Sequence, residues 1–264
     1  MCAIVGFCGY VPEGQWGQTH EILSELLIAG EHRGRDATGF AAAAQPLGSK
    51  HPRVIVAKEP VPALDFVLDN PDFRRLSRRR CIAFLGHNRA ATHGASRNNR
   101  NNHPHVGHVG LYLVHNGIIP DYREIADKYA LRQRSECDSE VLLRLVEVSD
   151  HPAAGLEACL RETRGSMAVA LYDERDNIIW LARNGGRPLW LARLARDRRW
   201  FFGSTPQILL NAFRRVLGAG VHARLDYLAP VPEDIPLSLS PDGIILAPMA
   251  TVGGNPLASR MERP

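Results

Sequence analysis

The chain has 264 residues, 45% hydrophobic and 23% charged, which excludes a disordered protein and suits one large domain or two small ones. A formal net charge of +4 is only mildly basic and lacks the strong charge asymmetry of a nucleic-acid binder. No run of about 18 apolar residues occurs, so we expect no membrane span. Five cysteines without a C-x-x-C pair, and no signal-peptide pattern, predict a reduced, cytoplasmic protein.

The first notable residue is Cys2, which directly follows Met1 and precedes a segment, 3–10, that predicts a short buried strand. Removal of Met1 would give Cys2 a free α-amino group next to its own thiol. Such an amine titrates at about pH 8 and can serve as a built-in base for the nucleophile. The alternative is that the position of Cys2 has no function, because a single residue is a weak motif.

The segments that follow alternate between helix and strand patterns. We expect a helix over 19–30, strands over 39–44, 53–58 and 81–90, and helical pieces over 60–76. Thr19 is the predicted helix N-cap. In the polar turn at 32–39, Arg33 could orient the N-terminus of the chain, or the turn could simply be held by salt bridges. The arginine-rich run at 74–80 is expected to be a solvated helix end rather than a binding surface.

Two later strands are expected to end in polar residues that suit substrate binding and catalysis. Arg89 could hold a carboxylate through its bidentate fork, and Thr92 could add hydrogen bonds. In the strand expected over 110–119, the Asn116 side-chain amide and the Gly117 N–H are donors of the kind that stabilise an oxyanion. The alternative for the Asn-Gly pair is a hairpin turn.

The second half of the chain begins with helices and continues with strands. Helices are expected over 121–129, 138–148, 152–164 and 206–213, and strands over 167–172, 178–183, 189–194, 200–203, 221–228, 235–239 and 244–247. Asp138 opens the second helix, either as an N-cap or as a carboxylate that pairs with a substrate ammonium. Two groups of strands with helical blocks between them predict an α+β fold in which two stacked sheets are covered by helices.

Together these residues meet the demands of a glutaminase, because Arg89 and Asp138 would hold an amino-acid head group while Cys2 attacks the side-chain carbonyl. The chain resembles the class II glutamine amidotransferases of the N-terminal nucleophile hydrolase superfamily, and in particular the glutaminase domain of glucosamine-6-phosphate synthases. The resemblance is carried by residues 1–6 (MCAIVG), 32–36 (HRGRD), 86–94 (GHNRAATHG), 102–105 (NHPH), 115–119 (HNGII), 137–140 (CDSE), 165–168 (GSMA) and 183–189 (RNGGRPL).

The resemblance implies a four-layer αββα sandwich, with a glutaminase domain over residues 1–250 and a tail over 251–264. It implies Cys2 as the nucleophile that forms a thioester, with Asn116 and Gly117 as the oxyanion hole and no cofactor. The residues it implies for glutamine binding are Arg89, Thr92, His93 and Asp138, and Arg33 would support the N-terminus. The loop after Arg89 would close over the substrate.

The resemblance also implies a structural role for His103, His105 and nearby His108. We expect no metal site there, because no carboxylate or cysteine completes a ligand set. The chain departs from the family at Ala3, where glycine is usual, and at Ala90, where an aromatic residue usually helps to gate ammonia. The alanine at position 90 therefore bears on coupling to an ammonia channel more than on hydrolysis.

No synthase or ligase domain follows residue 264, so we expect a stand-alone subunit that hydrolyses L-glutamine and passes ammonia to a separate synthase or ligase. Two alternatives remain. The chain could be an amidase of another γ-glutamyl compound, or a non-catalytic module that senses glutamine or binds a partner. The non-catalytic module would require Met1 to stay in place.

Overall fold

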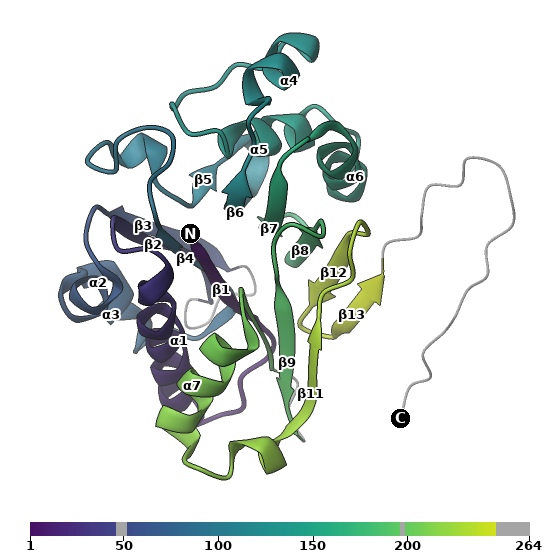
Figure 1. Cartoon of the computed structure of the whole chain (residues 1–264). Helices are drawn as coiled ribbons and strands as arrows, with labels where there is room; N and C mark the ends of the chain where they lie inside the picture. Colours follow the sequence, from purple (N-terminus) through teal and green to yellow (C-terminus); the bar gives the residue numbers. More distant parts are fainter. Residues whose placement is uncertain (46–51, 196–198, 247–264) are drawn as a thin grey trace, which may run out of the picture.

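The computed structural model of the protein describes residues 1–45, 52–195 and 199–246. Within these residues, two antiparallel sheets are stacked, and helices cover the outer face of each (Figure 1). The prediction of an α+β sandwich with two stacked sheets is therefore confirmed. The predicted tail, 251–264, lies outside the described residues, so the domain boundary at residue 250 stays a prediction.

The first sheet places the N-terminal strand in its interior. Its strand order is β11 (Leu225–Pro230), β9 (Trp190–Leu194), β10 (Trp200–Gly203), β1 (Ala3–Cys8), β4 (Cys81–Arg89), β2 (Ala37–Ala44) and β3 (Arg53–Glu59). Every residue of β1 is buried. Val5 and Phe7 pack in the cluster under the helices, whereas Ile4 and Cys8 face the second sheet. A strand covered on both faces needs an uninterrupted apolar sequence, and this explains why 3–8 lacks polar alternation.

The second sheet has the order β13 (Gly243–Leu246), β12 (Leu237–Ser240), β8 (Ile178–Arg183), β7 (Ser166–Asp173), β6 (Leu111–Ile118) and β5 (His105–Val106). The space between the two sheets is filled partly by small side chains, among them Ala41, Ala43, Ala83, Ala168 and Ala170. Small residues on both inner faces let the two sheets approach each other closely.

Two groups of helices form the outer layers (Figure 1). The helices on the first sheet are α1 (Trp16–Gly30), α2 (Ala63–Asp69), α3 (Pro71–Leu76) and α7 (Pro206–Leu217). The helices on the second sheet are α4 (Tyr122–Lys128), α5 (Glu140–Glu147) and α6 (Pro152–Glu162). Among the described residues, no helix has both the length and the hydropathy needed to cross a membrane.

Three local predictions are corrected or sharpened by the structure. Helix α1 begins at Trp16, and Thr19 lies inside it, where its hydroxyl donates to the Gln15 carbonyl at 3.1 Å. The segment Val221–Arg224 forms a 3₁₀ turn, and the strand predicted there starts only at Leu225. The basic run is a solvated helix end, as predicted, because its arginines are exposed at the end of α3.

The strand register decides where the predicted site residues meet. Ala3 of β1 lies opposite Asn88 of β4, so Cys2 stands beside the last residue of β4, Arg89. Strand β6, from the second sheet, contacts both β1 and β4. The ends of three strands from two sheets therefore converge at one end of the sandwich, near the N-terminus marked in Figure 1.

Candidate active site

Cys2 lies against the backbone that follows β4. Its Sγ is 3.4 Å from the Ala90 amide nitrogen, which donates to it, and 3.5 Å from the Ala90 carbonyl oxygen. Burial raises the pKa of the Cys2 thiol, although the Ala90 hydrogen bond and the charge of Arg89 act in the opposite direction. The thiol is therefore neutral near pH 7, and its activation needs a base.

The segment after Arg89 is held in place by the turn that precedes β2. The Asp36 amide donates to the Arg89 carbonyl at 2.9 Å, and the Asp36 carboxylate accepts the Ala91 N–H at 2.7 Å. Gly34 is needed here because a Cβ at that position would overlap the backbone of Arg89 and Ala90. Asp36 thus fixes the peptide that touches the thiol, a role that the sequence analysis missed.

The same turn both orients the N-terminus and is held by a salt bridge, the two interpretations considered for it. Arg33 donates from Nε to the Cys2 carbonyl at 2.9 Å, so it holds the backbone of the candidate nucleophile. Arg35 forms an ion pair with Glu31 at 3.0 Å within the turn. Met1 is 67% exposed, so the residue that blocks the amine of Cys2 is accessible from solvent.

Asn116 and Gly117 lie near the end of β6 but still within the strand. Asn116 pairs with Ala168 and Gly117 with Met167, so the hairpin-turn interpretation of this Asn-Gly pair is wrong. Asn116 is 1% exposed, and its side-chain Nδ2 has no hydrogen-bond partner among the described residues. A buried amide donor without a partner is uncommon, and its presence at a candidate site is what an oxyanion hole requires.

Gly117 is restricted to glycine by its neighbour across the ladder. A Cβ on Gly117 would overlap the carbonyl oxygen of Ser166 on β7. The close approach of the two strands therefore depends on this glycine, and it sets the position of the backbone after Asn116.

Arg89 is buried, and its guanidinium is already well hydrogen-bonded. It donates to the Asn102 side-chain oxygen at 2.8 Å, to the Gly94 carbonyl at 2.9 Å and to the His93 carbonyl at 2.5 Å. Asn102 is fully buried and was missed by the sequence analysis, although it lies in one of the quoted motifs. For Arg89 to hold a substrate carboxylate, the segment at 90–94 would have to give up some of these bonds.

Asp138 connects the start of α5 to the end of β6. Its Oδ2 accepts the Ile119 N–H at 2.8 Å and lies 3.7 Å from Nδ1 of His93. The N-cap of α5 is Ser139, so the N-cap interpretation of Asp138 is wrong. Besides the larger effect of burial, the charge of Asp138 raises the pKa of the Cys2 thiol and that of Arg89 lowers it.

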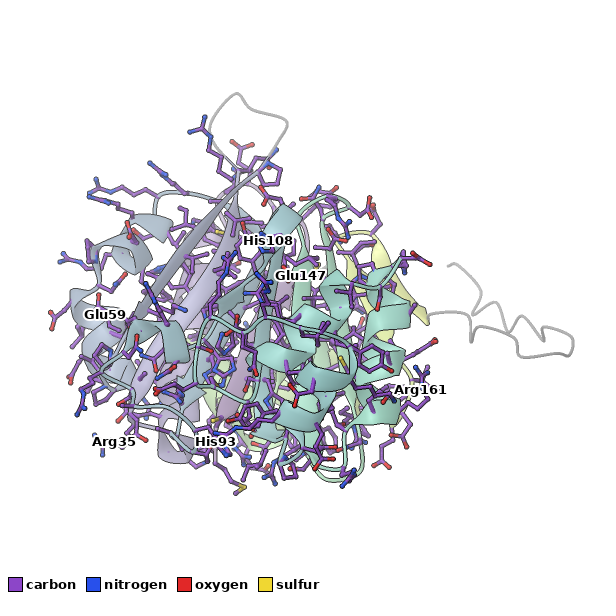
Figure 2. All side chains as sticks on the ribbon, turned by 90° about the horizontal axis from the view of Figure 1, so that it is seen from above. Arg35, Glu59, His93, His108, Glu147 and Arg161 are labelled. Atoms are coloured by element: carbon purple, nitrogen blue, oxygen red, sulfur yellow. The ribbon has the colours of Figure 1, made fainter. Side chains whose placement is uncertain are left out.

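Two further predicted residues sit at the rim. The ring of His93 packs edge-on against Tyr122 with centroids 5.6 Å apart, and Figure 2 shows it away from His108 and Glu147, which lie together. Thr92 is exposed, and no hydrogen bond ties its side chain to the residues described above. The structure therefore joins Cys2 to Arg33 and to the peptide after Arg89, and Asp138 to His93. Asn116 and Gly117 lie on β6, which contacts β1 and β4, and Thr92 is exposed in the segment after Arg89.

Below this site lies a layer of buried histidines. Nε2 of His87 lies within hydrogen-bond distance of the His115 carbonyl oxygen, at 2.9 Å. Nδ1 of His115 lies 2.7 Å from the hydroxyl of Ser139. Burial lowers the pKa of His87 to about 3 and that of His115 to about 4, so both rings are neutral at pH 7. They support the strands under the site rather than carrying charge into it.

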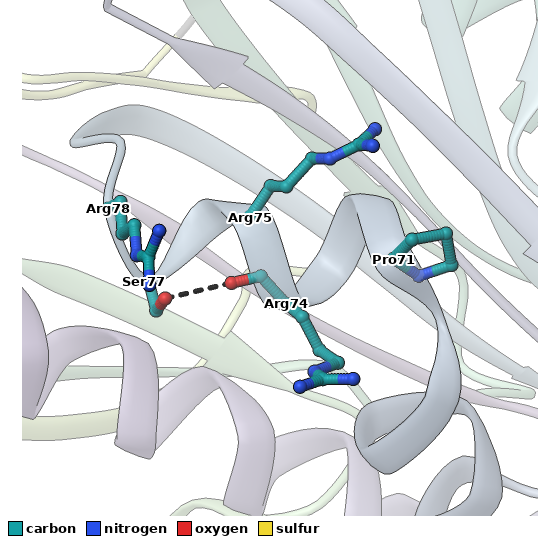
Figure 3. Close-up of a pocket in the computed structure, with 5 residues that line it drawn as sticks. All are labelled: Pro71, Arg74, Arg75, Ser77 and Arg78. Carbon is teal, nitrogen blue, oxygen red and sulfur yellow. Dashed lines mark hydrogen bonds between the residues drawn. The ribbon is translucent and has the colours of Figure 1, made fainter.

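A separate hollow lies on α3 and has no link to these residues. Its volume is about 340 Å³, and it is lined by Pro71, Arg74, Arg75, Ser77 and Arg78 (Figure 3). The Ser77 hydroxyl donates to the Arg74 carbonyl at 2.8 Å, and Arg75 pairs with Asp72 at 2.9 Å. It is a shallow feature of a solvated helix end, and none of the predicted site residues lines it.

Comparisons with known proteins point to one family. A family model described as a glutamine amidotransferase domain matches residues 87–211. The glutamine–fructose-6-phosphate aminotransferase of Staphylococcus aureus is 33% identical over 192 residues, which cover 70% of this chain and 29% of that enzyme. The enzyme of the same name from Halalkalibacterium halodurans is 32% identical over the same shares of the two chains.

The chain contains a class II glutamine amidotransferase domain. A solved glutamine phosphoribosylpyrophosphate amidotransferase from B. subtilis shares the fold of this amidotransferase domain, with a TM-score of 0.71 at 20% identity over 93% of this chain and 49% of that one. The domain aligns with only 29% of the length of its curated relatives. The matched segment, 87–211, includes Arg89, Asn116 and Asp138, whereas Cys2 and Arg33 lie before it.

Proposed function

We propose that the chain is a glutaminase subunit that hydrolyses L-glutamine to glutamate and ammonia through a thioester on Cys2. The observation that carries the proposal is the buried, unpartnered amide of Asn116 on a strand that contacts the strand beginning after Cys2. A nucleophile and an oxyanion donor that converge from two sheets are the minimum for acyl transfer.

In the proposed reaction, Met1 is absent and the α-amine of Cys2 takes the thiol proton. Sγ then attacks the γ-carbonyl carbon, and the developing oxyanion accepts hydrogen bonds from Asn116 and the Gly117 N–H. The resulting ammonium group returns the proton to the leaving nitrogen, which departs as ammonia. Water then attacks the thioester and releases glutamate. Arg33 contributes by holding the Cys2 carbonyl, which limits the directions in which the amine and thiol can point.

Recognition of the amino-acid head group is assigned to Arg89 and Asp138. Asp138 supplies a buried carboxylate for the substrate ammonium, and His93 lies beside it at the rim. Because Arg89 donates to the carbonyls of His93 and Gly94, we expect substrate binding to rearrange the 90–94 segment. This exchange couples carboxylate binding to a movement of the loop that touches the thiol.

Ammonia is proposed to pass to a separate synthase or ligase. The named relatives are aminotransferases and amidotransferases, and the matched part of the fructose-6-phosphate enzyme is less than a third of its length. Ala90, whose backbone N–H contacts the Cys2 sulfur, has only a methyl side chain where the family usually has an aromatic residue. The surface of the partner enzyme would then have to complete the passage for ammonia.

The deciding experiment measures glutamate release from glutamine by protein whose intact mass shows that Met1 is absent, with the Cys2→Ala variant as control. We expect release by the parent and at most background release by the variant, together with a trapped γ-glutamyl adduct on Cys2. Equal release by the two proteins would overturn the proposal.

The two alternatives are tested with the same material. If a panel of γ-glutamyl compounds shows faster turnover of one that lacks a free α-amino or α-carboxyl group, the amidase function is favoured. If Met1 is retained in the purified protein and glutamine binds without turnover, the chain is a sensing or partner-binding module.

A further inference from the structure

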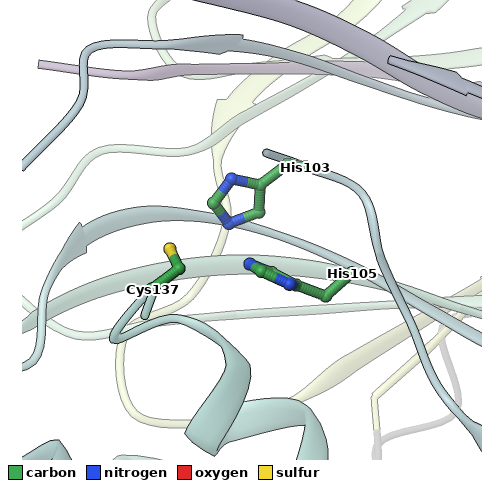
Figure 4. A group of neighbouring side chains, drawn as sticks. All are labelled: His103, His105 and Cys137. Carbon is green, nitrogen blue, oxygen red and sulfur yellow. The ribbon is translucent and has the colours of Figure 1, made fainter. Parts of the chain in front are cut away.

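Three side chains that bind transition metals meet beneath the site, and the proposed reaction uses none of them. His103, His105 of β5 and Cys137, just before α5, converge from two separate segments (Figure 4). One ligand atom of each lies within 4.8 Å of the other two, and all three residues are buried. The prediction of no metal site rested on the lack of a carboxylate or cysteine to complete a ligand set, and the fold brings Cys137 to the two histidines.

Three ring nitrogens of this cluster lack hydrogen-bond partners. Both ring nitrogens of His103 and the Nε2 of His105 are buried, and none has a hydrogen-bond partner among the described residues. The two rings meet edge to face with centroids 4.5 Å apart, so neither satisfies the other. A buried polar group that is left unpaired destabilises the folded protein. A group that binds these nitrogens would remove a substantial penalty.

Charged groups of both signs surround the cluster. Lys58 donates to the carbonyls of Asn102 and Pro104, on either side of His103, and Arg89 is also close enough to affect the histidine. These cations oppose a metal ion. On the other side, Asp138 lies 3.8 Å from the sulfur of Cys137, and a thiolate would add a second negative charge at the cluster itself.

We propose that His103, His105 and Cys137 bind one Zn²⁺ ion. Two neutral imidazoles and one thiolate are a common zinc ligand set, and three protein ligands leave the fourth tetrahedral position for water. Two imidazole nitrogens and one sulfur on a tetrahedral zinc lie about 3.3–3.6 Å apart, so the three side chains need to close by up to about 1.5 Å. On binding, the thiol of Cys137 loses its proton to solvent and sulfur bonds to the metal.

The position of this site would let the metal join two segments that hold the head-group residues of the proposed glutamine site. Zinc would join the segment at 102–105 to the start of α5. Asn102 in the first segment holds Arg89, and Asp138 in the second directly follows Cys137. Both head-group residues of the proposed glutamine site would then be fixed through one ion, without contact between the ion and the substrate.

The test is metal content and cobalt spectroscopy on the whole chain. After dialysis against a weak chelator, we expect about one zinc per chain by mass spectrometry of the metal. Replacement by Co²⁺ is expected to give tetrahedral d–d bands and a sulfur-to-cobalt charge-transfer band in the near ultraviolet. Absence of both zinc and the charge-transfer band in the parent protein would overturn the proposal and leave a water-filled polar cluster.

Matched variants locate the ion. Cys137→Ser is expected to lose the charge-transfer band and most of the zinc, whereas Cys159→Ala, another buried cysteine of the same helical layer, retains both. Cys2→Ala must also retain both, because an N-terminal amine and thiol can themselves chelate a metal. Loss in Cys2→Ala with retention in Cys137→Ser would place the metal at the nucleophile and contradict the assignment. These outcomes do not depend on glutaminase activity.

Discussion

At the scale of single residues, the proposed site depends on an amide donor, Asn116 Nδ2, that has no hydrogen-bond partner among the described residues. The amide of Asn116 is held in a paired strand, next to a glycine that the neighbouring Ser166 carbonyl excludes from having a side chain. A donor fixed in this way needs no reorganisation when negative charge develops on a substrate oxygen, and such preorganisation is the physical basis of oxyanion stabilisation.

Replacement of Asn116 by alanine is therefore expected to lower kcat by about 10²–10³-fold with little change in KM, because the lost interaction forms mainly in the transition state. The measurement is steady-state glutamine hydrolysis. The control is Asn211→Ala, an asparagine exposed on α7, which should leave both constants unchanged. A rise in KM with unchanged kcat would indicate that Asn116 binds ground-state substrate instead.

The raised pKa of the Cys2 thiol predicts how the rate of its alkylation depends on pH. Burial raises its pKa above the ordinary value of 9.0, so the thiolate forms only as pH rises beyond that value. In protein that retains Met1, alkylation of Cys2 by iodoacetamide should keep accelerating above pH 9.0, because the reactive thiolate is still increasing. Protein without Met1 should react at lower pH through its adjacent amine. Identical pH profiles would contradict the role of the amine.

At the scale of elements, the connection into α5 is set by one buried carboxylate. Glu140 accepts hydrogen bonds from the backbone of Arg134 and Ser135, and Arg144 donates to it at 2.6 Å. Burial by itself raises the pKa of Glu140, but the hydrogen bonds from Ser135 and Arg144 outweigh it, and the net pKa is lowered from 4.5. The stability that Glu140 contributes is therefore present above pH 4.5 and is lost as pH falls through its lowered pKa.

Glu140→Gln should reduce the free energy of unfolding at pH 7 by about 2–3 kcal/mol, because it leaves part of a buried ionic network unpaired while Glu147 still holds Arg144. Urea unfolding would measure this change. Glu21→Gln, on the exposed face of α1, should change stability by at most about 0.5 kcal/mol. If the deficit of Glu140→Gln does not shrink toward acid pH, the assigned pKa direction is wrong.

Helices and strands could be predicted from the sequence where a local pattern of apolar and turn residues defines them. Strand β1 and the paired strands β2 and β3 follow from apolar runs bounded by turn residues. The start of α1 was missed because Trp16, whose indole N–H donates to the Leu76 carbonyl, begins the helix through a tertiary contact. Val221 is apolar and fully buried, but its burial follows from packing against the α7 layer and not from a strand.

At the scale of the whole molecule, the two sheets are held together by small residues between them. Ala170 on β7 is fully buried in this cluster, which also holds larger side chains such as Phe202 and its ladder partner Leu181. Ala170→Leu should therefore destabilise the protein by about 1–3 kcal/mol through overpacking. Thermal unfolding should show this as a Tm lower by about 2–4 °C per kcal/mol.

The matched substitution for this test is Ala154→Leu, which adds the same volume at an exposed position of α6. It should leave Tm nearly unchanged, because leucine is a good helix former and meets no packed neighbour. Equal Tm values for Ala170→Leu and the parent would show that the space between the sheets can expand, contrary to the close packing described here.

The sequence by itself determined the class of fold, the family and the residues with the right chemistry, because periodicity and short motifs are local properties of the chain. Only the tertiary structure decided how these residues meet. Strand register placed the thiol of Cys2 on the Ala90 amide, and folding engaged Arg89 with the Asn102 side chain and loop carbonyls. It also brought Cys137 to the two histidines. Such contacts join segments far apart in the sequence, so no local pattern records them.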